Sequence, residues 1–440
     1  EIVAVDTPTG VGLGALRLAI DRVVAAVPVA GDTGRARLWV DRCFATAGAG
    51  TVVTGTLTGG GLAVDDEVEV VGPTAGRRPA RIRGLRAQGD PVGAVGPGNR
   101  VAVALAGVAH RDVARGDAVV HPGNWHLTTV VDASLRVLDA LDHDVSRRGA
   151  WLAYLGSGEH PAAVRVLGPD RLAPGDEGAV RLRLPHALAL APGDRFVLRE
   201  SGRGETVGGG AVLDVEPVLP AARARPDRDP ARVVAERGWV AADHLGRLLG
   251  SPPPPTAGTA VGRWVVAPAA LAAAVDELRS AVAAAGALGL DVATLDERAR
   301  AVIDRVDEIV VAGGRATEAG TVDPLAAHPY LAALAAAPVA PPAPETAGVE
   351  RAELRALVQR GLVVESDGHH FAPEAIAAAA RAVAALLVDR PDGVTVSDVR
   401  DALATSRKHA LPLLAVLDTT GVTRRRGDLR VGGPRLPAPG

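Results

Sequence analysis

The residues with the clearest chemistry in this chain are cationic and lie near its C-terminal end. They form two groups: Arg407, Lys408 and His409, and then Arg424, Arg425, Arg426 and Arg430. Positions 395–435 hold eight cations and four anions, whereas the whole chain has a formal net charge of −3. This local excess predicts a site for a polyanion, because arginine and lysine bind phosphate groups strongly. The alternative is a solvated surface in a protein that uses arginine almost everywhere in place of lysine.

The kind of polyanion follows from the residues around the cations. No Phe, Trp or Tyr is interleaved with them, so bases are not expected to stack on an aromatic platform. The pattern instead favours the backbone and a few exposed bases of a folded RNA or DNA. Contacts to about five phosphates would give a log–log salt slope of roughly −3 to −5.

The sequence excludes one kind of site, because Lys408 is the only lysine. The phosphate-binding loop G-x-x-x-x-G-K-[ST] needs Ser or Thr after the lysine, and here His409 follows. The guanine-reading motif N-K-x-D needs Asn before the lysine, and here Arg407 precedes it. We therefore expect no GTP or Mg²⁺ site on this chain, no catalytic residue, and no GTPase activity from the chain alone.

Other reactive residues are sparse. The single cysteine, Cys43, rules out a disulfide within the chain and suits a cytoplasmic protein. His369 and His370 lack companion ligands in the sequence, so we expect no metal site. No apolar run is long enough to span a membrane, and the first residues do not resemble a signal peptide. The chain contains no methionine, from which we expect it to be part of a longer reading frame.

The cationic groups need an element to position them, and the last stretch has the helix–helix–hairpin order of a winged helix. Thr395 or Ser397 can cap a helix over V-R-D-A-L, and Ser406 can cap a second helix that begins R-K-H. Cations in the first turn oppose the helix dipole, and a bound phosphate would reverse that cost. Pro412 lies inside the second helix and should end or kink it.

The rest of the chain shows two sequence patterns, one helical and one strand-rich. Helical segments alternate with short hairpins from residue 225 to 435, which suits about four winged helices. Before them, alternating strands that end at Gly, Pro or Asp predict two β-barrels. The clearest barrel run is R-L-W-V-D-R-C-F-A-T-A-G-A-G-T-V-V-T-G-T, in which Gly48 and Gly50 form a corner between short strands.

The N-terminal residues predict a strand over Ile2–Val5 and an amphipathic helix from about Leu13 to Val27, together the remnant of an α/β domain. The predicted fold class is therefore multidomain β plus α, with two β-barrels, tandem winged helices and a small α/β remnant. The expected domains are the remnant at 1–28, barrels at 29–122 and 123–220, and winged helices at 225–280, 281–328, 329–373 and 374–435.

Several of these runs resemble the translational GTPases. G-A-G-T-V-V-T-G-T-L, with D-D-E-V-E-V-V-G after it, is similar to their second domain. R-F-V-L-R-E-S-G-R-G-E-T-V-G-G-G-A-V-L-D is similar to the end of their third domain. The tail, with T-S-R-K-H-A-L-P-L-L and T-G-V-T-R-R-R-G-D-L-R, narrows the resemblance to the selenocysteine-specific elongation factors, the SelB family, without most of the GTPase domain. V-D-T-P-T-G-V-G-L-G-A-L resembles the last GTPase loop and helix, although Asp6-Thr7 replace the usual Ser-Ala.

The resemblance implies a role in protein synthesis. The family carries selenocysteinyl-tRNA to a ribosome paused at UGA while its tail holds a hairpin in the mRNA, and GTP and Mg²⁺ belong to the N-terminal domain of the full-length proteins. It implies that the cationic residues of the tail bind the mRNA hairpin and that Arg203 contacts the tRNA stem. It also implies a cytoplasmic monomer that has no membrane partner.

The resemblance further implies that Asp41, Arg42 and Arg100 form the pocket for the aminoacyl group. A selenol is a stronger acid than a thiol and is an anion at neutral pH, so two guanidinium groups would favour selenocysteine over serine or cysteine. Asp41 could orient an arginine or bind the α-amino group. Read alone, Asp41 and Arg42 are equally compatible with a surface ion pair of little energetic consequence, and Arg203 with an ordinary turn arginine.

Three other interpretations stay open. A winged-helix DNA-binding regulator would usually pair two recognition helices, but no dimerising coil is visible and two barrels would have no role. A complete GTPase acting alone would need the missing nucleotide motifs. A general elongation or initiation factor would have no use for the tail. The missing GTPase domain is compatible with a fragment and with a truncated paralogue.

Overall fold

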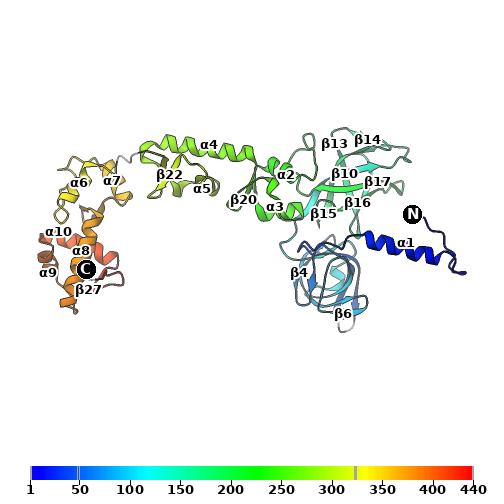
Figure 1. Ribbon diagram of the computed structural model, residues 1–440, viewed down its shortest axis with the longest axis horizontal. Helices are drawn as coiled ribbons and strands as arrows, with labels where there is room; N and C mark the ends of the chain where they lie inside the picture. Colours follow the sequence, from blue (N-terminus) through cyan, green and yellow to red (C-terminus); the bar gives the residue numbers. More distant parts are fainter. Residues whose placement is uncertain (1, 47, 49, 322–324, 439–440) are drawn as a thin grey trace. The chain divides into compact units, whose positions relative to one another are not determined.

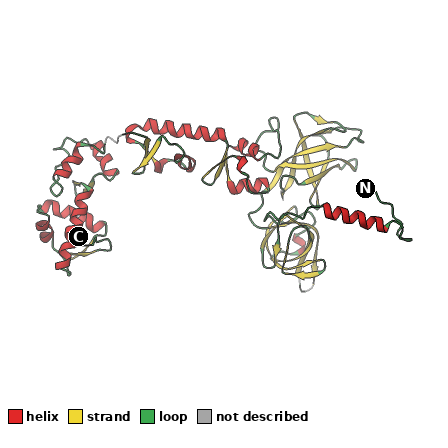
Figure 2. Ribbon diagram, in the orientation of Figure 1, coloured by secondary structure: helices red, strands yellow, loops and turns green. Residues whose placement is uncertain are grey.

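The fold combines β-barrels with small helical units. The computed structural model describes residues 2–46, 48, 50–321 and 325–438 (Figure 1). The chain divides into two compact units, Glu1–Ala272 and Ala273–Gly440. Figure 2 shows that strands dominate the first unit and helices the second, which confirms the predicted multidomain β plus α class. Within the described ranges, no helix is both long enough and apolar enough to cross a membrane.

The first helix, α1 (Leu13–Ala26), forms as predicted. The strand expected over Ile2–Val5 is wrong, because the backbone beyond it makes only an isolated bridge between Asp6 and Val11. A strand needs a hydrogen-bonded neighbour, and none of the described strands pairs with this segment. Apolar side chains of α1 stay exposed, Ile20 among them, so the amphipathic face has no partner among the described residues.

Six strands form the first barrel. They are β1 (Arg37–Thr46), β2 (Gly50–Thr58), β4 (Glu67–Gly72), β5 (Gly76–Ala87), β8 (Arg100–Ala106) and β9 (Ala118–Val120). Their order is β4-β9-β1-β2-β8-β5, and β4 pairs with β5 to close the ring. The smaller elements are β3 (Leu62–Ala63), β6 (Asp90–Val92), β7 (Ala94–Val95) and the 3-10 helix η1 (His110–Asp112). Aliphatic side chains such as Leu38, Leu57 and Ile82 fill the interior, in keeping with the scarcity of aromatic residues.

The second barrel is also closed. Its strands, in ring order, are β10 (Leu127–Val137), β15 (Glu177–Ala189), β13 (Gly158–Leu167), β12 (Trp151–Leu155), β16 (Arg195–Glu200) and β17 (Glu205–Asp214). A small sheet pairs β11 (Val145–Ser146) with β14 (Arg171–Leu172). The three consecutive glycines of β17 allow close approach to β10, since a Cβ on Gly210 would lie 1.8 Å from the carbonyl oxygen of Ser134.

A helix–hairpin unit follows the second barrel. It contains α2 (Pro230–Arg237), β18 (Trp239–Ala241), α3 (Ala242–Leu249), η2 (Pro255–Ala257), β19 (Thr259–Val261) and β20 (Trp264–Val266). Val233 and Leu245 of this unit belong to the same buried apolar cluster as Leu135 of the barrel. The barrel and the first helix–hairpin unit therefore share one core, which fixes their mutual position.

The next helix, α4 (Pro268–Ala285), runs through the predicted boundary between residues 280 and 281, so the division there stays a proposal. Two more groups of short elements follow it. The first contains η3 (Gly286–Leu288), β21 (Leu290–Asp291), η4 (Val292–Thr294), α5 (Glu297–Ile303), β22 (Ile309–Ala312) and β23 (Arg315–Glu318). The second contains α6 (Pro329–Ala336), α7 (Arg351–Gln359), β24 (Val364–Ser366) and β25 (His369–Phe371).

The last unit contains α8 (Pro373–Asp389), α9 (Val396–Ala402), α10 (Arg407–Thr419), β26 (Thr423–Arg426) and β27 (Leu429–Gly432). Thr395 caps α9 in a reciprocal capping box with Asp398, as one of the two predicted alternatives requires. Ser406 is the N-cap residue of α10 as predicted, but its side chain makes no capping bond and lies against His409 instead. Helix α10 also does not end at Pro412, which lies inside it and is buried.

Candidate functional site

The first candidate site is the barrel cluster, which consists of Asp41, Arg42, Thr54 and Arg100. Asp41 is the extra residue of a β-bulge, because Val40 pairs with Gly55 and the next pair joins Arg42 to Thr54. A Cβ on Gly55 would lie 2.0 Å from the carbonyl oxygen of Trp39, so glycine is required where the bulged strand approaches β2. Bulges re-aim side chains beside functional sites, and this one turns Asp41 toward β8.

Hydrogen bonds hold Asp41 to two neighbouring strands. Arg100 donates from Nη1 to Oδ2 at 2.5 Å and from Nη2 to Oδ1 at 3.1 Å, and the Thr54 hydroxyl donates to Oδ1 at 2.6 Å. Partial burial tends to raise the pKa of Asp41, but the hydrogen bonds from Thr54 and Arg100 outweigh it and lower that pKa below its ordinary value. The carboxylate is therefore charged at neutral pH and fixes the position of Arg100.

Arg42 completes the cluster without a fixed partner. Its side chain is exposed, and none of the described residues is hydrogen-bonded to its guanidinium, although its charge helps to lower the pKa of Asp41. Phe44 and Ala102 are two positions from Arg42 and Arg100 on the same strands, so all four side chains lie on one face of the sheet. That face is hollowed by a cavity of about 710 Å³ whose lining includes Phe44, Val52, Arg83, Arg86 and Ala102.

The sequence identified only part of this site. It predicted Asp41, Arg42 and Arg100, and the structure brings Asp41 and Arg100 into direct contact. It did not identify Thr54 or the hollow. Thr54 could have been found from the T-G-T run, since a glycine beside a bulge places its neighbour opposite the bulged residue. The hollow depends on strand order, which local sequence does not reveal.

Arg203 lies in the turn between β16 and β17, where it is surrounded by carboxylates. Its guanidinium lies 3.0 Å from Asp142, 3.5 Å from Glu200 and 3.9 Å from Glu205. The side chain is half exposed, so a tRNA contact stays a proposal. The surrounding carboxylates offset its charge, which makes it a weaker phosphate ligand than the sequence suggests.

The second candidate site is the basic tip, which consists of Arg407, Lys408, Arg424, Arg425 and Arg426. All five side chains are exposed. Two of them lie in the first turn of α10, where the backbone N–H groups have no intrahelical acceptor. The other three follow one another on β26, whose pairing with β27 confirms the predicted hairpin. Helix amides beside Arg407 and Lys408 can bind a phosphate, and so can the three guanidinium groups of β26.

Arg430 does not belong to the basic tip, which corrects the predicted list. It is only 6% exposed, and its Nε donates to Oδ2 of Asp418 at 3.0 Å. The hydroxyl of Thr423, which is fully buried, donates to the other oxygen of Asp418 at 2.5 Å. Asp418 therefore ties the hairpin to α10, and Arg430 is a structural residue. The sequence could not show this, because the partner lies on another element.

His409 is also less accessible than predicted. It is partly buried, and the ring of His369 lies edge-on to it with the centroids 5.3 Å apart. Burial lowers the pKa of His409, and the charges of His369 and Lys408 lower it further. Ser366 donates a hydrogen bond of 3.0 Å to the carbonyl of Pro412. The hairpin β24–β25 therefore packs on the first half of α10, a contact that no feature of the sequence predicts.

These features define a class of protein: a factor with two barrels of the translation-factor type and a winged-helix tail. Residues 146–218 match the family described as "Selenocysteine-specific elongation factor, beta-barrel domain", and residues 387–431 match "Elongation factor SelB, winged helix". The chain is thus of the SelB type: it carries a β-barrel and a winged helix like those of the selenocysteine-specific elongation factors.

Individual relatives agree with this assignment. A selenocysteine-specific elongation factor of Desulfomicrobium baculatum is 32% identical over 213 residues, which are 48% of this chain and 33% of that protein. The Escherichia coli K12 protein of the same name is 30% identical over 218 residues, covering 46% and 33%. The chain therefore matches about a third of the length of these curated relatives. A crystal structure titled as a bacterial selenocysteine-specific elongation factor, EF-Sec, has a similar fold, with a TM-score of 0.64 and 19% identity over 98% of this chain and 75% of that one.

The family is one of translational GTPases, and the residues here do not fit GTP or Mg²⁺. The only lysine, Lys408, does not lie in a phosphate-binding loop. It lies in the first turn of α10, which begins R-K-H-A-L. A phosphate-binding loop requires a glycine-rich turn before that lysine and a hydroxyl residue after it. We therefore propose no chemical step on this chain that involves GTP.

Proposed function

We propose that this chain holds selenocysteinyl-tRNA through its barrels and a hairpin of the mRNA through its last winged helix, so that selenocysteine is delivered to a ribosome at a UGA codon. The observation that carries the proposal is the barrel cluster, in which one aspartate holds one arginine and leaves a second arginine free beside a hollow. GTP hydrolysis belongs to the N-terminal domain of the full-length relatives.

The barrel cluster suits a small anion with a neighbouring amine. Arg42 and Arg100 together offer guanidinium donors to a selenolate, while serine and cysteine present a neutral hydroxyl or a mainly neutral thiol at pH 7. Asp41 has two roles in this scheme: it holds Arg100, and its charge attracts the α-amino group of the aminoacyl ester. The hollow, with its apolar residues and the arginines Arg83 and Arg86, accommodates the terminal nucleotide that carries the ester.

A binding experiment with charged tRNA tests the cargo proposal. The chain, joined to the GTPase domain of a relative where tRNA binding requires it, is titrated with selenocysteinyl-, cysteinyl- and seryl-tRNA. We expect Arg42→Ala to reduce the preference for selenocysteine by about tenfold or more, because a hydrogen bond to a charged group contributes about 1.5–3 kcal/mol. Arg78→Ala is the control, since Arg78 is exposed on β5 and does not line the hollow. An unchanged preference in Arg42→Ala would refute the role of the cluster.

The basic tip suits a folded RNA. Its five cations are exposed and lack an aromatic platform, so the contacts are with the phosphate backbone and a few unpaired bases. The test compares stem-loop RNAs taken from downstream of in-frame UGA codons with random duplex RNA at moderate salt. We expect a clear preference for one class of stem-loop. Equal binding of stem-loop and random duplex would refute the proposal, and a preference for duplex DNA would favour a DNA-binding regulator instead.

A further inference from the structure

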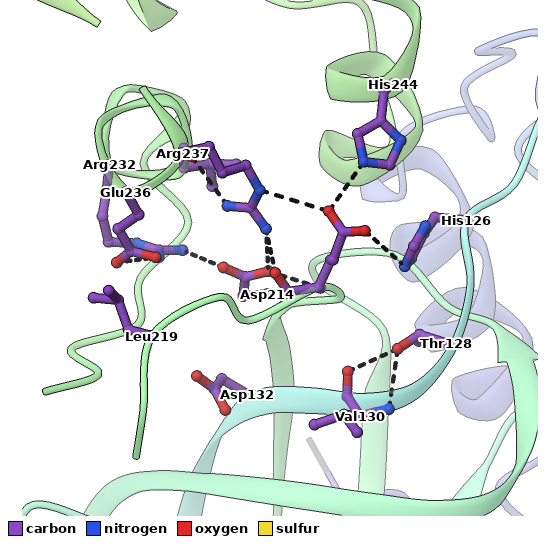
Figure 3. A network of polar contacts seen from close by, with 12 residues as sticks. His126, Thr128, Val130, Asp132, Asp214, Leu219, Arg232, Glu236, Arg237 and His244 are labelled. Carbon is purple, nitrogen blue, oxygen red and sulfur yellow. Dashed lines mark hydrogen bonds and ion pairs between the residues drawn. The ribbon is translucent and has the colours of Figure 1, made fainter. Parts of the chain in front are cut away.

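A polar network joins the second barrel to the first helix–hairpin unit, and three potential metal ligands meet at one side of it (Figure 3). His126 precedes β10, Glu216 follows β17, and His244 lies on α3. Their ligand atoms all lie within 4.8 Å of one another. Three separate segments of the chain therefore present two imidazoles and a carboxylate to one point, which we call the histidine cluster (His126, Glu216 and His244).

We propose that the histidine cluster binds a divalent transition-metal ion, for which zinc is the best fit. Two histidines and a carboxylate are a donor set that Zn²⁺ accepts with its fourth position open to water. Nε2 of His244 lies 3.0 Å from Oε2 of Glu216, and Nε2 of His126 lies 3.8 Å from Oε1 of the same residue. Zinc bonds of about 2.0–2.2 Å place tetrahedral ligand atoms roughly 3.4 Å apart, so small side-chain rotations are enough to complete the site.

The histidines are accessible to an ion. Each imidazole has its Nε2 near the Glu216 carboxylate, and a metal binds through such a ring nitrogen. The side chains of His126 and His244 keep 21% and 31% of their surface exposed, so an ion and its water can reach them.

The charge around the cluster favours a divalent cation. In this network, two guanidinium groups, those of Arg232 and Arg237, form ion pairs with four carboxylates: Asp214, Glu216, Asp227 and Glu236. Two negative charges remain uncompensated, which is the charge that one divalent ion neutralises. Opposite charges in a partly buried site attract more strongly than in water.

Arg237 does not block the site. Its Nη1 donates to the carbonyl of Val233 at 3.0 Å, and its Nη2 donates to the backbone carbonyl of Glu216. Nε lies 3.6 Å from the Glu216 carboxylate and has no hydrogen-bond partner. The guanidinium is therefore anchored by backbone oxygens, and the carboxylate of Glu216 is free to rotate toward a metal without breaking a hydrogen bond from Arg237.

A second group of potential metal ligands differs from the histidine cluster in its ion pairs. Asp142, His143 and Glu205 also bring their ligand atoms within 4.8 Å of one another. There, however, Arg203 lies 3.0 Å from Asp142 and 3.9 Å from Glu205, so a guanidinium already supplies the positive charge. Of these two groups, only the histidine cluster combines two imidazoles with a carboxylate, and Nε of Arg237 lies 3.6 Å from that carboxylate without a hydrogen bond to it.

A metal at this position would join the two ends of the second barrel to α3. Glu216 and His126 lie where the chain leaves β17 and enters β10, and His244 belongs to the first helix–hairpin unit. Binding to the folded state alone stabilises that state in proportion to the logarithm of the free metal concentration. The site would thus hold the unit on the barrel at a surface that the shared apolar core already defines.

Metal titration of the whole chain tests the proposal. The protein is treated with a chelator and then titrated with Zn²⁺ and, separately, with Co²⁺, whose visible absorption reports a tetrahedral site. We expect one equivalent to bind, and we expect His126→Gln and His244→Gln each to weaken binding by more than about tenfold. His143→Gln is the matched control, because it removes an imidazole from the second group and should leave the titration unchanged.

Further measurements separate loss of metal from loss of fold. Circular dichroism of the chelator-treated variants should match the unsubstituted chain, and zinc should raise the thermal midpoint of that chain but not of the variants. If His244→Gln in α3 fails to fold, His126→Gln decides, since His126 lies outside any helix or strand. The proposal is overturned if the chain binds less than one equivalent at micromolar zinc, or if both histidine variants bind as the unsubstituted chain does.

Discussion

The barrel cluster and the basic tip both expose arginine side chains, but they hold these side chains differently. On the barrel, Asp41 accepts two hydrogen bonds from Arg100 and lies beside Arg42. At the tip, none of the described carboxylates pairs with Arg424, Arg425 or Arg426. A held guanidinium has a defined geometry and a reduced net charge, which suits the discrimination of one small anion from another. Free guanidinium groups give charge without fixed geometry, which suits a long polyanion.

The last unit contains both arrangements within a few residues. Arg430 is held by Asp418 and buried, while Arg425, its cross-strand partner, is exposed. The held residue ties the hairpin to α10, and the exposed residue remains available to a ligand. Arginine content alone therefore does not predict which arginines are available; the distribution of carboxylate partners does.

The largest effect should come from removing the free arginines. We expect Arg424→Ala, Arg425→Ala and Arg426→Ala combined to weaken stem-loop RNA binding by roughly a hundredfold to a thousandfold at moderate salt, because three phosphate contacts are lost together. The log–log salt slope should become less steep by about two to three units. Filter binding at several salt concentrations measures both quantities.

Two control variants test whether the loss of RNA binding depends on removing arginines that have no carboxylate partner. Arg400→Ala, in which the lost arginine pairs with Asp401, should change RNA affinity by less than about threefold, since a compensated charge releases few counterions. In the barrel, Arg42→Ala should change cargo preference with little change in salt slope. If the triple variant and Arg400→Ala weaken RNA binding equally, the distinction between free and held arginines is wrong.

A smaller effect should come from removing a carboxylate that holds an arginine. Asp418→Asn leaves Arg430 buried without a charged partner, so we expect the free energy of unfolding of the last unit to fall by about 2–3 kcal/mol. Chemical denaturation followed by hydrogen exchange in α10 and β27 measures this loss. Asp41→Asn on the barrel should cost less than about 1 kcal/mol, because Arg100 is more than half exposed, while still altering cargo preference.

The control for Asp418→Asn and Asp41→Asn is Asp428→Asn in the hairpin turn. Asp428 forms no ion pair with any of the described residues. It should leave stability unchanged within about 0.5 kcal/mol. Equal destabilisation by Asp418→Asn and Asp428→Asn would mean that burial of Arg430 does not depend on its aspartate.

The sequence predicted the elements better than the contacts between them. Strand alternation and glycine corners predicted both barrels, and capping chemistry predicted Thr395 as one of two candidate caps for α9. The sequence did not predict that Arg430 is buried or that Ser406 lacks a side-chain capping bond, because each side chain contacts a partner, Asp418 or His409, that depends on the folded structure. The strand at Ile2–Val5 failed because β-propensity has no effect without a neighbouring strand.

The histidine cluster is a second case in which tertiary packing, rather than local sequence, brings side chains together. His126 and His244 are far apart in the chain and show no ligand spacing, so the sequence predicts no metal site at these residues. The shared core of the second barrel and the first helix–hairpin unit brings them together. Sites built from three separate segments become visible only when that packing is known.

The smallest effect concerns Asp398, a carboxylate in the first turn of α9 that holds a helix end and an arginine at once. Its Oδ2 accepts hydrogen bonds of 2.8 Å from the backbone N–H and from the hydroxyl of Thr395, and its Oδ1 pairs with Arg390. Chiefly through the backbone bond, these contacts lower the pKa of Asp398 to about 2. Because the folded pKa lies below the unfolded one, the stabilisation is complete above about pH 4 and is lost as pH falls toward 2.

We therefore expect Asp398→Asn to lower the free energy of unfolding at pH 7 by about 0.5–1 kcal/mol, the size of one helix cap discounted for solvent exposure. The difference between the variant and the unsubstituted chain should shrink to nothing near pH 2, where the aspartate itself is protonated. Denaturant titrations at both pH values measure it, with Asp401→Asn as the control because Asp401 pairs with Arg400 but caps no helix. A difference that is the same at pH 2 and pH 7 would mean that Asp398 acts through its shape rather than its charge.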